Sequence, residues 1–136
     1  MKNNLETLDL LKDLPFLDKN LRRIDKAILQ SLPPKNLSKI SKAIHYSVIN
    51  GGKRIRPQLV LLMAETLELD VSKKTIDLMA ASGELIHCYS LIHDDLPSMD
   101  DDDYRRGKLS CHKKFDEATA ILAGDAIQPL ALEVLT

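Results

Sequence analysis

The chain has 136 residues, a formal net charge of −1 and a hydrophobic content of 44%, a composition typical of one globular unit that can bury a moderate core. Because positive and negative charges nearly balance, no general basic field is available for nucleic acid, and function has to be argued from local charge clusters. The N-terminal segment lacks the unbroken apolar core of a signal peptide, and the longest strongly apolar run, at 59–64, is too short to span a bilayer. We therefore expect a cytoplasmic protein with no nucleic-acid partner and no stable membrane insertion.

The two cysteines favour the same compartment. Cys88 and Cys111 show no CxxC spacing. They are typical of reduced thiols rather than of a disulfide framework or a zinc site.

Apolar residues in the first third of the chain recur at helical spacing, which predicts three amphipathic helices. The first carries four leucines at this spacing, namely Leu5, Leu8, Leu11 and Leu14. The second covers residues 18–31, ends before the prolines at 33–34, and has an apolar face made of Leu21, Ile24, Ile28 and Leu32. Ser38 is expected to cap the third helix, which stops at 50–52. Its core-facing residues are Ile40, Ile44 and Val48.

Three further helical segments follow in the sequence. Pro57 suits the first turn of a fourth helix over 57–69. Ser72 is expected to cap a fifth helix that covers Thr75 to about Asp95 and ends before Pro97. A last helical pattern begins near Glu117 and continues to the last residue. No segment alternates with a period of two for long enough to predict a strand, so we expect an all-α fold.

The last helical pattern is strongly apolar along 121–136 and finishes without a glycine cap or a basic residue. A helix this apolar needs neighbours on several sides. We therefore expect residues 1–136 to be the N-terminal portion of a single larger helical domain.

Six aspartates fall within ten positions, from Asp94 to Asp103. Acidic runs are most often solvated loops, but Asp94 and Asp95 close an apolar helix, where carboxylates face the negative end of the macrodipole at a cost of up to ~1 kcal/mol each. Divalent cations would offset this cost, and magnesium prefers carboxylate oxygens and is commonly shared with substrate phosphates. Pro97 lets the chain turn and bring Asp100 back toward Asp94. The spacing does not fit an EF-hand loop, so the cluster predicts a magnesium–phosphate site.

Two basic clusters accompany the aspartates. Lys53, Arg54 and Arg56 lie in GGKRIRP between two glycines and a helix-starting proline, an arrangement that suits an anion cradle although basic loops usually just face solvent. Arg105 and Arg106 directly follow the acids in YRRG, and arginine forks match phosphate oxygens in a way that lysine cannot. One acidic and two basic clusters together predict two polyphosphate substrates, one bound through metal and one bound directly.

The motifs GGKRIRP, LIHDDLPSMDDDDYRRG and AILAGDAI, in this order over about 38–136, resemble the trans-polyprenyl diphosphate synthases, and most closely the bacterial farnesyl type. The resemblance implies the isoprenoid synthase helical bundle, Mg2+ as cofactor and a homodimer. It also implies a prenyltransferase that condenses isopentenyl diphosphate with an allylic diphosphate, dimethylallyl or geranyl, to give farnesyl diphosphate. This reaction fits the clusters of acidic and basic residues. Negative charge develops on the diphosphate as it departs, and preorganised metal ions and arginines can neutralise that charge.

The resemblance also assigns roles to individual residues. It implies that the principal magnesium ligands are Asp94 and Asp100, with Asp95 beside them. It implies that Arg105 contacts the allylic diphosphate and completes a catalytic set with these three aspartates. The implied contacts of isopentenyl diphosphate are Lys53, Arg56, His87 and Arg106. Taken alone, His87 would more often be a core histidine, but it lies about two helical turns before Asp94 on one face.

The resemblance further suggests how product length is set. Tyr89 precedes Asp94 by about 7 Å along the same helix, and an aromatic residue five places before this motif resembles the farnesyl type. The small side chain of Ser90 leaves room for one more unit than a bulky neighbour would. We therefore expect Tyr89 and Ser90 to limit the product to fifteen carbons, although an apolar-helix tyrosine more commonly packs in the core.

Several alternatives stay open at this point. A geranylgeranyl diphosphate synthase of the same family shares the motifs. The family carries a second aspartate-rich motif with no counterpart among these residues, so the chain alone is expected to be inactive, and a truncated, non-catalytic diphosphate-binding module is a further alternative. An HD-type phosphohydrolase would use His93-Asp94 with His87 and Asp125, but it gives the two basic motifs no role. A helical interaction module without enzymatic activity explains the apolar ends but not the charge clusters.

Overall fold

The structure is a computed structural model that describes residues 15–136. The predicted helix with leucines at 5, 8, 11 and 14 lies outside the described residues. The main helices are α2 (Pro15–Ser31), α3 (Lys39–Ile49), α4 (Ile55–Thr66), α5 (Lys73–Asp94) and α7 (Glu117–Glu133). A short hairpin of β1 (Tyr104–Arg105) and β2 (Lys108–Leu109) and the short helix α6 (Cys111–Lys114) stand between α5 and α7. The prediction of an all-α fold is confirmed for the body of the molecule.

Two of the predicted helix starts are confirmed by their caps. The Ser38 hydroxyl accepts a hydrogen bond from the Ser41 N–H (3.0 Å), and the Ser41 hydroxyl accepts one from the Ser38 N–H (2.9 Å), which forms a reciprocal capping box at α3. The Ser72 hydroxyl accepts a hydrogen bond from the Thr75 N–H (3.0 Å) at the start of α5. Each cap satisfies a backbone donor that the first helical turn leaves without a partner.

Two predicted helix ends are wrong by three residues. Helix α4 ends at Thr66 instead of 69, because Glu68 adopts a left-handed backbone with a φ of 49° that an α-helix cannot continue through. Helix α7 ends at Glu133 and Val134 is its C-cap, so the expected continuation of the helix to residue 136 is also wrong.

The sequence predicted no strands, and this prediction is wrong in one place. Strands β1 and β2 pair antiparallel, with Tyr104 opposite Leu109 and Arg105 opposite Lys108. Arg106 and Gly107 form the turn with φ values of 54° and 77°, and two consecutive positive values match the right-handed twist of a hairpin. Two residues per strand are too few to produce an alternating pattern in the sequence.

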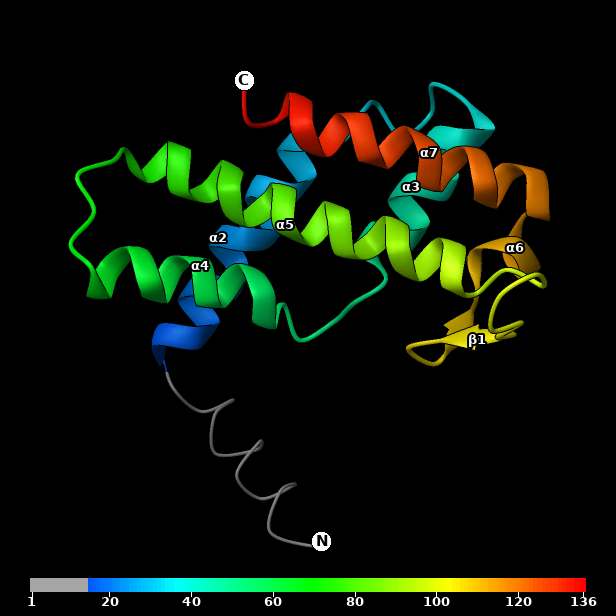
Figure 1. Cartoon of the computed structure of the whole chain (residues 1–136), viewed down its shortest axis with the longest axis horizontal. Helices are drawn as coiled ribbons and strands as arrows, with labels where there is room; N and C mark the ends of the chain where they lie inside the picture. Colours follow the sequence, from blue (N-terminus) through cyan, green and yellow to red (C-terminus); the bar gives the residue numbers. More distant parts are fainter. Residues whose placement is uncertain (1–14) are drawn as a thin grey trace, which may run out of the picture.

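Helix α5 runs through the middle of the molecule, with α4 along one side and α7 along the other, while α2 and α3 complete the bundle (Figure 1). Small buried side chains line both α5 and α7, namely Ala80 and Ala81 on the first and Ala120, Ala123 and Ala131 on the second. The hydroxyl of Ser82 donates a hydrogen bond to the Ala131 carbonyl (2.7 Å) and so links the two helices inside the core. Packing of α5 on several sides fixes the position of the loop that follows it.

The core-facing residues predicted for α2 and α3 are largely confirmed. Ile24, Ile28, Ile44 and Val48 are at most 3% exposed. Leu32 and Ile40 are partly buried and pack against the same cluster. No helix within residues 15–136 is both long enough and apolar enough to cross a membrane.

We predict that Ile127→Ala in α7 lowers the free energy of unfolding by about 2–5 kcal/mol, because the side chain is fully buried and its removal leaves a cavity. The matched control is Ile121→Ala on the same helix, where the isoleucine is 42% exposed and the loss should stay below about 1 kcal/mol. Urea unfolding followed by circular dichroism measures both. Equal losses for the two variants would contradict the packing of α7 described above.

Candidate active site

The acidic segment forms a tight turn at the C-terminal end of α5. Helix α5 ends at Asp94, and the N–H of Asp100 donates a hydrogen bond to the Asp94 carbonyl (2.8 Å). The N–H of Asp101, which has a left-handed φ of 51°, donates to the Leu96 carbonyl (3.1 Å). The predicted return of Asp100 toward Asp94 is therefore confirmed for the backbone, and it groups the aspartates around one helix end.

Asp95 is held away from solvent by an arginine. Its side chain is only 3% exposed and accepts hydrogen bonds from Nε of Arg105 (2.9 Å) and from Nη2 of the same guanidinium. Nη2 of Arg105 also donates to Asp102 (3.1 Å). The hydrogen bond to Asp95 holds the pKa of Arg105 above its ordinary value, although partial burial opposes this shift. Both donors meet Oδ1 of Asp95, so Arg105 leaves the other carboxylate oxygen without a hydrogen bond from it.

A different set of donor atoms is clustered on the hairpin side of the turn. Within residues 15–136, one group of three metal-capable side chains has ligand atoms within 4.8 Å of one another, namely Asp101, Asp103 and His112. Nζ of Lys113 lies 2.8 Å from Asp103, and its hydrogen bond lowers the pKa of the Asp103 carboxyl. A cation at this cluster would therefore have to compete with an ammonium group that already neutralises one carboxylate.

The basic motif at 51–57 divides into two exposed residues and one buried residue. Lys53 and Arg56 face solvent, as an anion-binding role requires. Arg54 is only 6% exposed and forms an ion pair with Glu84 on α5 (2.8 Å). The prediction that Arg54 belongs to the exposed anion cradle is therefore wrong, because the side chain is buried against Glu84. The signal for this pairing was a glutamate in the apolar segment GELIHCYS, because a buried charged residue needs a partner of opposite charge.

The two basic motifs meet near the end of α5. Nη1 of Arg106, in the hairpin turn, donates a hydrogen bond to the Gly51 carbonyl. Gly52 has a φ of 130°, and a Cβ atom at this position would collide with the Arg106 guanidinium. The pair of glycines therefore allows the loop before α4 to touch the hairpin that follows the aspartates.

His87 lies within the field of these basic residues. It is half-buried on α5, and burial lowers its pKa below the ordinary value. The positive charges of Arg56, Arg106 and Arg105 lower the pKa further, while Glu84 opposes them. The structure therefore brings His87 and three of the predicted anion-binding arginines together. Their roles stay predictions.

The residues assigned to product length lie on the same helix. Tyr89 is partly buried and packs against the core cluster, and its ring meets the ring of His93 edge to face at a centroid distance of 5.9 Å. The hydroxyl of Ser90 donates a hydrogen bond to the His87 carbonyl (2.9 Å). Tyr89 and Ser90 therefore lie between His87 and the end of α5, and both are partly buried.

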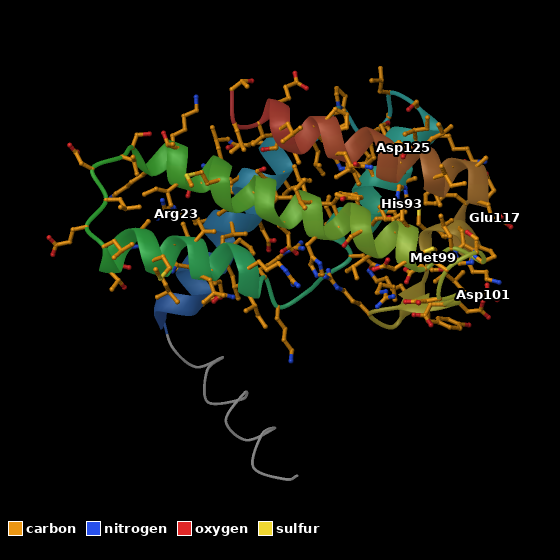
Figure 2. All side chains as sticks on the ribbon, viewed as in Figure 1. Arg23, His93, Met99, Asp101, Glu117 and Asp125 are labelled. Carbon is orange, nitrogen blue, oxygen red and sulfur yellow. The ribbon has the colours of Figure 1, made fainter. Side chains whose placement is uncertain are left out.

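His93 is packed between α5 and α7, where it faces Asp125 (Figure 2). Its Nε2 atom lies 3.2 Å from the Ile121 carbonyl and 3.8 Å from the Asp125 carboxylate. A Cβ atom at Gly124 would collide with the imidazole ring, so the glycine of AILAGDAI makes room for this histidine. These contacts fix the last turn of α5, and they leave His93 in a structural position.

The thiols are also accounted for by the structure. Cys88 and Cys111 are both free and buried, in agreement with the prediction of reduced cysteines. Burial raises the pKa of the Cys88 thiol to about 11, so this side chain is a poor nucleophile at neutral pH.

Comparison with known proteins gives a consistent result. A sequence model of the family described as Polyprenyl synthetase matches residues 37–136. The farnesyl diphosphate synthase of Haemophilus influenzae is 46% identical over 125 residues, which are 92% of this chain and 41% of that protein. A geranyltransferase structure from Legionella pneumophila superposes with a TM-score of 0.81 at 53% identity, over 88% of this chain and 42% of its own. A geranyltranstransferase structure from Thermotoga maritima gives a TM-score of 0.83 at 40% identity, over 88% and 44%.

The helical bundle and the acidic turn agree with the matched family model. The chain belongs to the polyprenyl synthetase family. It spans about two fifths of the length of the relatives it matches. The alternative of an HD-type phosphohydrolase is thereby excluded as the family, and His93, which that alternative needs as a ligand, is packed against Gly124.

Proposed function

We propose that the intact protein is a prenyltransferase that condenses isopentenyl diphosphate with dimethylallyl or geranyl diphosphate to give farnesyl diphosphate. The observation that carries this proposal is the meeting of two separate basic motifs and one acidic turn at the C-terminal end of α5. Two diphosphate groups need two sets of positive charge. The diphosphate that departs also needs carboxylates nearby, because they can hold a metal ion that it shares.

The described chain is proposed to be the N-terminal portion of one synthase domain. This proposal is supported by the relatives, of which the chain covers about two fifths. Large apolar side chains on the outer faces of α4 and α7 also support it, since they are about half exposed and suit burial against further helices. They are Leu59, Met63 and Leu67 on and after α4, and Ile121, Leu122 and Leu132 on α7. The remaining portion would supply further metal ligands, so the chain alone would be inactive.

Asp94 and Asp100 are the proposed magnesium ligands. Neither carboxylate forms an ion pair with another residue of the described part of the chain, so both have oxygens to offer. Magnesium takes oxygen ligands and keeps several waters, which fits two carboxylates at the end of a turn. When bound, it would neutralise part of the negative charge that develops on the departing diphosphate. Asp95 would orient Arg105 through Oδ1, and its Oδ2, which Arg105 does not use, would serve as a further magnesium ligand.

Arg105 is proposed to bind the allylic diphosphate. Its Nε and Nη2 atoms are used by Asp95 and Asp102, which leaves Nη1 for a phosphate oxygen. A guanidinium held on one edge by a buried carboxylate is preorganised, so little freedom is lost when the substrate binds.

Lys53, Arg56, His87 and Arg106 are proposed to bind isopentenyl diphosphate. Burial and the positive charges around His87 lower its pKa, and a diphosphate placed among these charges would raise it again. The imidazole could then donate a hydrogen bond to a phosphate oxygen as a charged group, which is the stronger kind of hydrogen bond.

Tyr89 and Ser90 are proposed to end chain growth at fifteen carbons, since both lie on α5 before Asp94 and are partly shielded from solvent. A geranylgeranyl diphosphate synthase is the second candidate, because it would use the same charged residues. We also infer that the intact protein is cytoplasmic, as the composition and the buried free cysteines suggest, and that it is a homodimer, as the family resemblance implies.

We predict that Asp94→Asn in the intact protein lowers kcat by roughly 100-fold or more, because it removes a ligand of the magnesium ion that would neutralise the leaving diphosphate. The matched control is Asp101→Asn, which removes a carboxylate of the neighbouring cluster of Asp101, Asp103 and His112. Steady-state kinetics with labelled isopentenyl diphosphate measures both variants, and circular dichroism checks the fold. Full activity in the Asp94 variant, with a loss in the Asp101 variant, would move the metal site to that neighbouring cluster.

We predict that the two basic motifs serve different substrates. Arg56→Lys should raise KM for isopentenyl diphosphate roughly tenfold while leaving KM for geranyl diphosphate nearly unchanged, since a lysine keeps the charge but loses the planar fork. Arg105→Lys should do the reverse. Kinetics with each diphosphate varied in turn measures the four KM values. If each variant affects both substrates equally, the assignment of the two anion sites is wrong.

We predict that Tyr89→Ala shifts the product toward twenty carbons or more, because removal of the ring opens space along α5 below the bound diphosphate. Chromatography of the dephosphorylated products measures the chain lengths. Tyr89→Phe is the control, since it keeps the ring and should keep the fifteen-carbon product. A Tyr89→Ala variant that still stops at fifteen carbons would leave the tyrosine with a packing role only.

A further inference from the structure

Arg54 differs from its neighbours in the basic motif because it points into the protein. Its Nη1 lies 2.8 Å from Glu84 on α5, its Nη2 donates to the Val48 carbonyl of α3 (2.9 Å), and its Nε donates to Asp25 of α2 (3.0 Å). The side chain is 5% exposed and that of Glu84 is 2% exposed. One guanidinium therefore joins three helices, and all three of its nitrogens are used.

The backbone around Arg54 needs such a contact. Gly51 and Gly52 have φ values of 81° and 130°, and Arg54 itself has a left-handed φ of 48°. A residue other than glycine persists in this conformation only when its surroundings hold it there. The three hydrogen bonds of Arg54 supply that restraint, and they lock the loop between α3 and α4.

The restraint acts at the proposed substrate site. Glu84 lies three residues before His87 on α5, so the two side chains are neighbours on the helix surface. Arg54 therefore attaches the loop to α5 beside His87, with Lys53 and Arg56 on either side of the attachment. The ion pair with Glu84 is the contact by which Arg54 ties the loop to the same helix as His87.

We propose that Arg54 is a positioning residue for isopentenyl diphosphate: through Glu84, Asp25 and the Val48 carbonyl it holds Lys53 and Arg56 beside His87, without touching the substrate itself. The inference rests on the function proposed above. Its mechanism is preorganisation, since a loop already fixed in its binding conformation loses little freedom when the diphosphate binds.

A purely structural role is the alternative, and a paired substitution separates the two roles. Removal of one partner leaves the other charge buried and uncompensated, so any single variant is unstable for reasons unrelated to the substrate. Replacement of both partners by apolar residues of similar size often restores stability. The informative variant is therefore Arg54→Met combined with Glu84→Leu, which leaves Asp25 able to face water because its side chain is 52% exposed.

The experiment uses the intact protein and measures thermal unfolding together with steady-state kinetics. We expect the double variant to recover most of the Tm that Arg54→Met alone loses. We expect its KM for isopentenyl diphosphate to stay raised by roughly ten- to 100-fold, because a misplacement of about 1 Å can cost that much. KM for geranyl diphosphate should be unchanged. Amide hydrogen exchange at 51–56 should become faster, while α5 stays protected.

A second ion pair provides the matched control. Arg23 on α2 pairs with Asp77 on α5 (2.5 Å), so it joins two of the same helices. It lies at the far end of α5 from the hairpin and the acidic turn (Figure 2). The double variant Arg23→Met with Asp77→Leu should leave both KM values unchanged.

The outcomes separate the inference from the proposed function. A double Arg54/Glu84 variant with normal KM for isopentenyl diphosphate, or with equal increases for both substrates, overturns the positioning role and leaves the proposed function intact. An unsubstituted intact protein that catalyses no condensation overturns both. A raised KM for isopentenyl diphosphate alone, in a variant of restored Tm, supports the positioning role.

Discussion

The arrangement of the molecule depends on the burial of α5 among its neighbouring helices. Alanines on α5 and α7 and the hydrogen bond from Ser82 to Ala131 fix the two helices against each other, and α2 and α4 pack against other sides of α5. Interiors this closely packed resist sliding and rotation. The end of α5 is therefore held firmly, and the acidic turn and Arg105 are attached to it.

The charged residues near the C-terminal end of α5 are of two kinds, those buried in ion pairs and those exposed to solvent. Asp95 and Arg54 belong to the same motifs as the proposed ligands, yet both are buried in ion pairs, with Arg105 and Glu84 respectively. Buried pairs of this kind contribute little net stability compared with apolar residues. Their benefit here is geometric, because each buried pair orients the motif to which it belongs. The exposed members of the two motifs stay accessible, Asp100 to cations and Arg56 to anions.

The sequence predicted the features that depend on local chemistry. The caps at Ser38 and Ser72 and the apolar faces of α2 and α3 follow from short-range rules, and the structure confirms them. The hairpin at 104–109 was missed because two-residue strands carry no periodicity. The inward orientation of Arg54 was missed because Glu84 is 30 residues away, and such a pairing is decided by tertiary packing. The ligand roles of Asp94 and Asp100 rest on the family resemblance and remain to be tested.

The contact between Gly52 and Arg106 has an evolutionary consequence. Any side chain at position 52 would occupy the volume now filled by the Arg106 guanidinium, and it would also have to adopt a backbone with a φ of 130°. A substitution at position 52 therefore requires that Arg106 be replaced or moved. The two positions, 54 residues apart in the chain, therefore constrain each other's substitutions. Among homologues the glycine should be lost mainly in lineages that have also replaced or redirected the arginine.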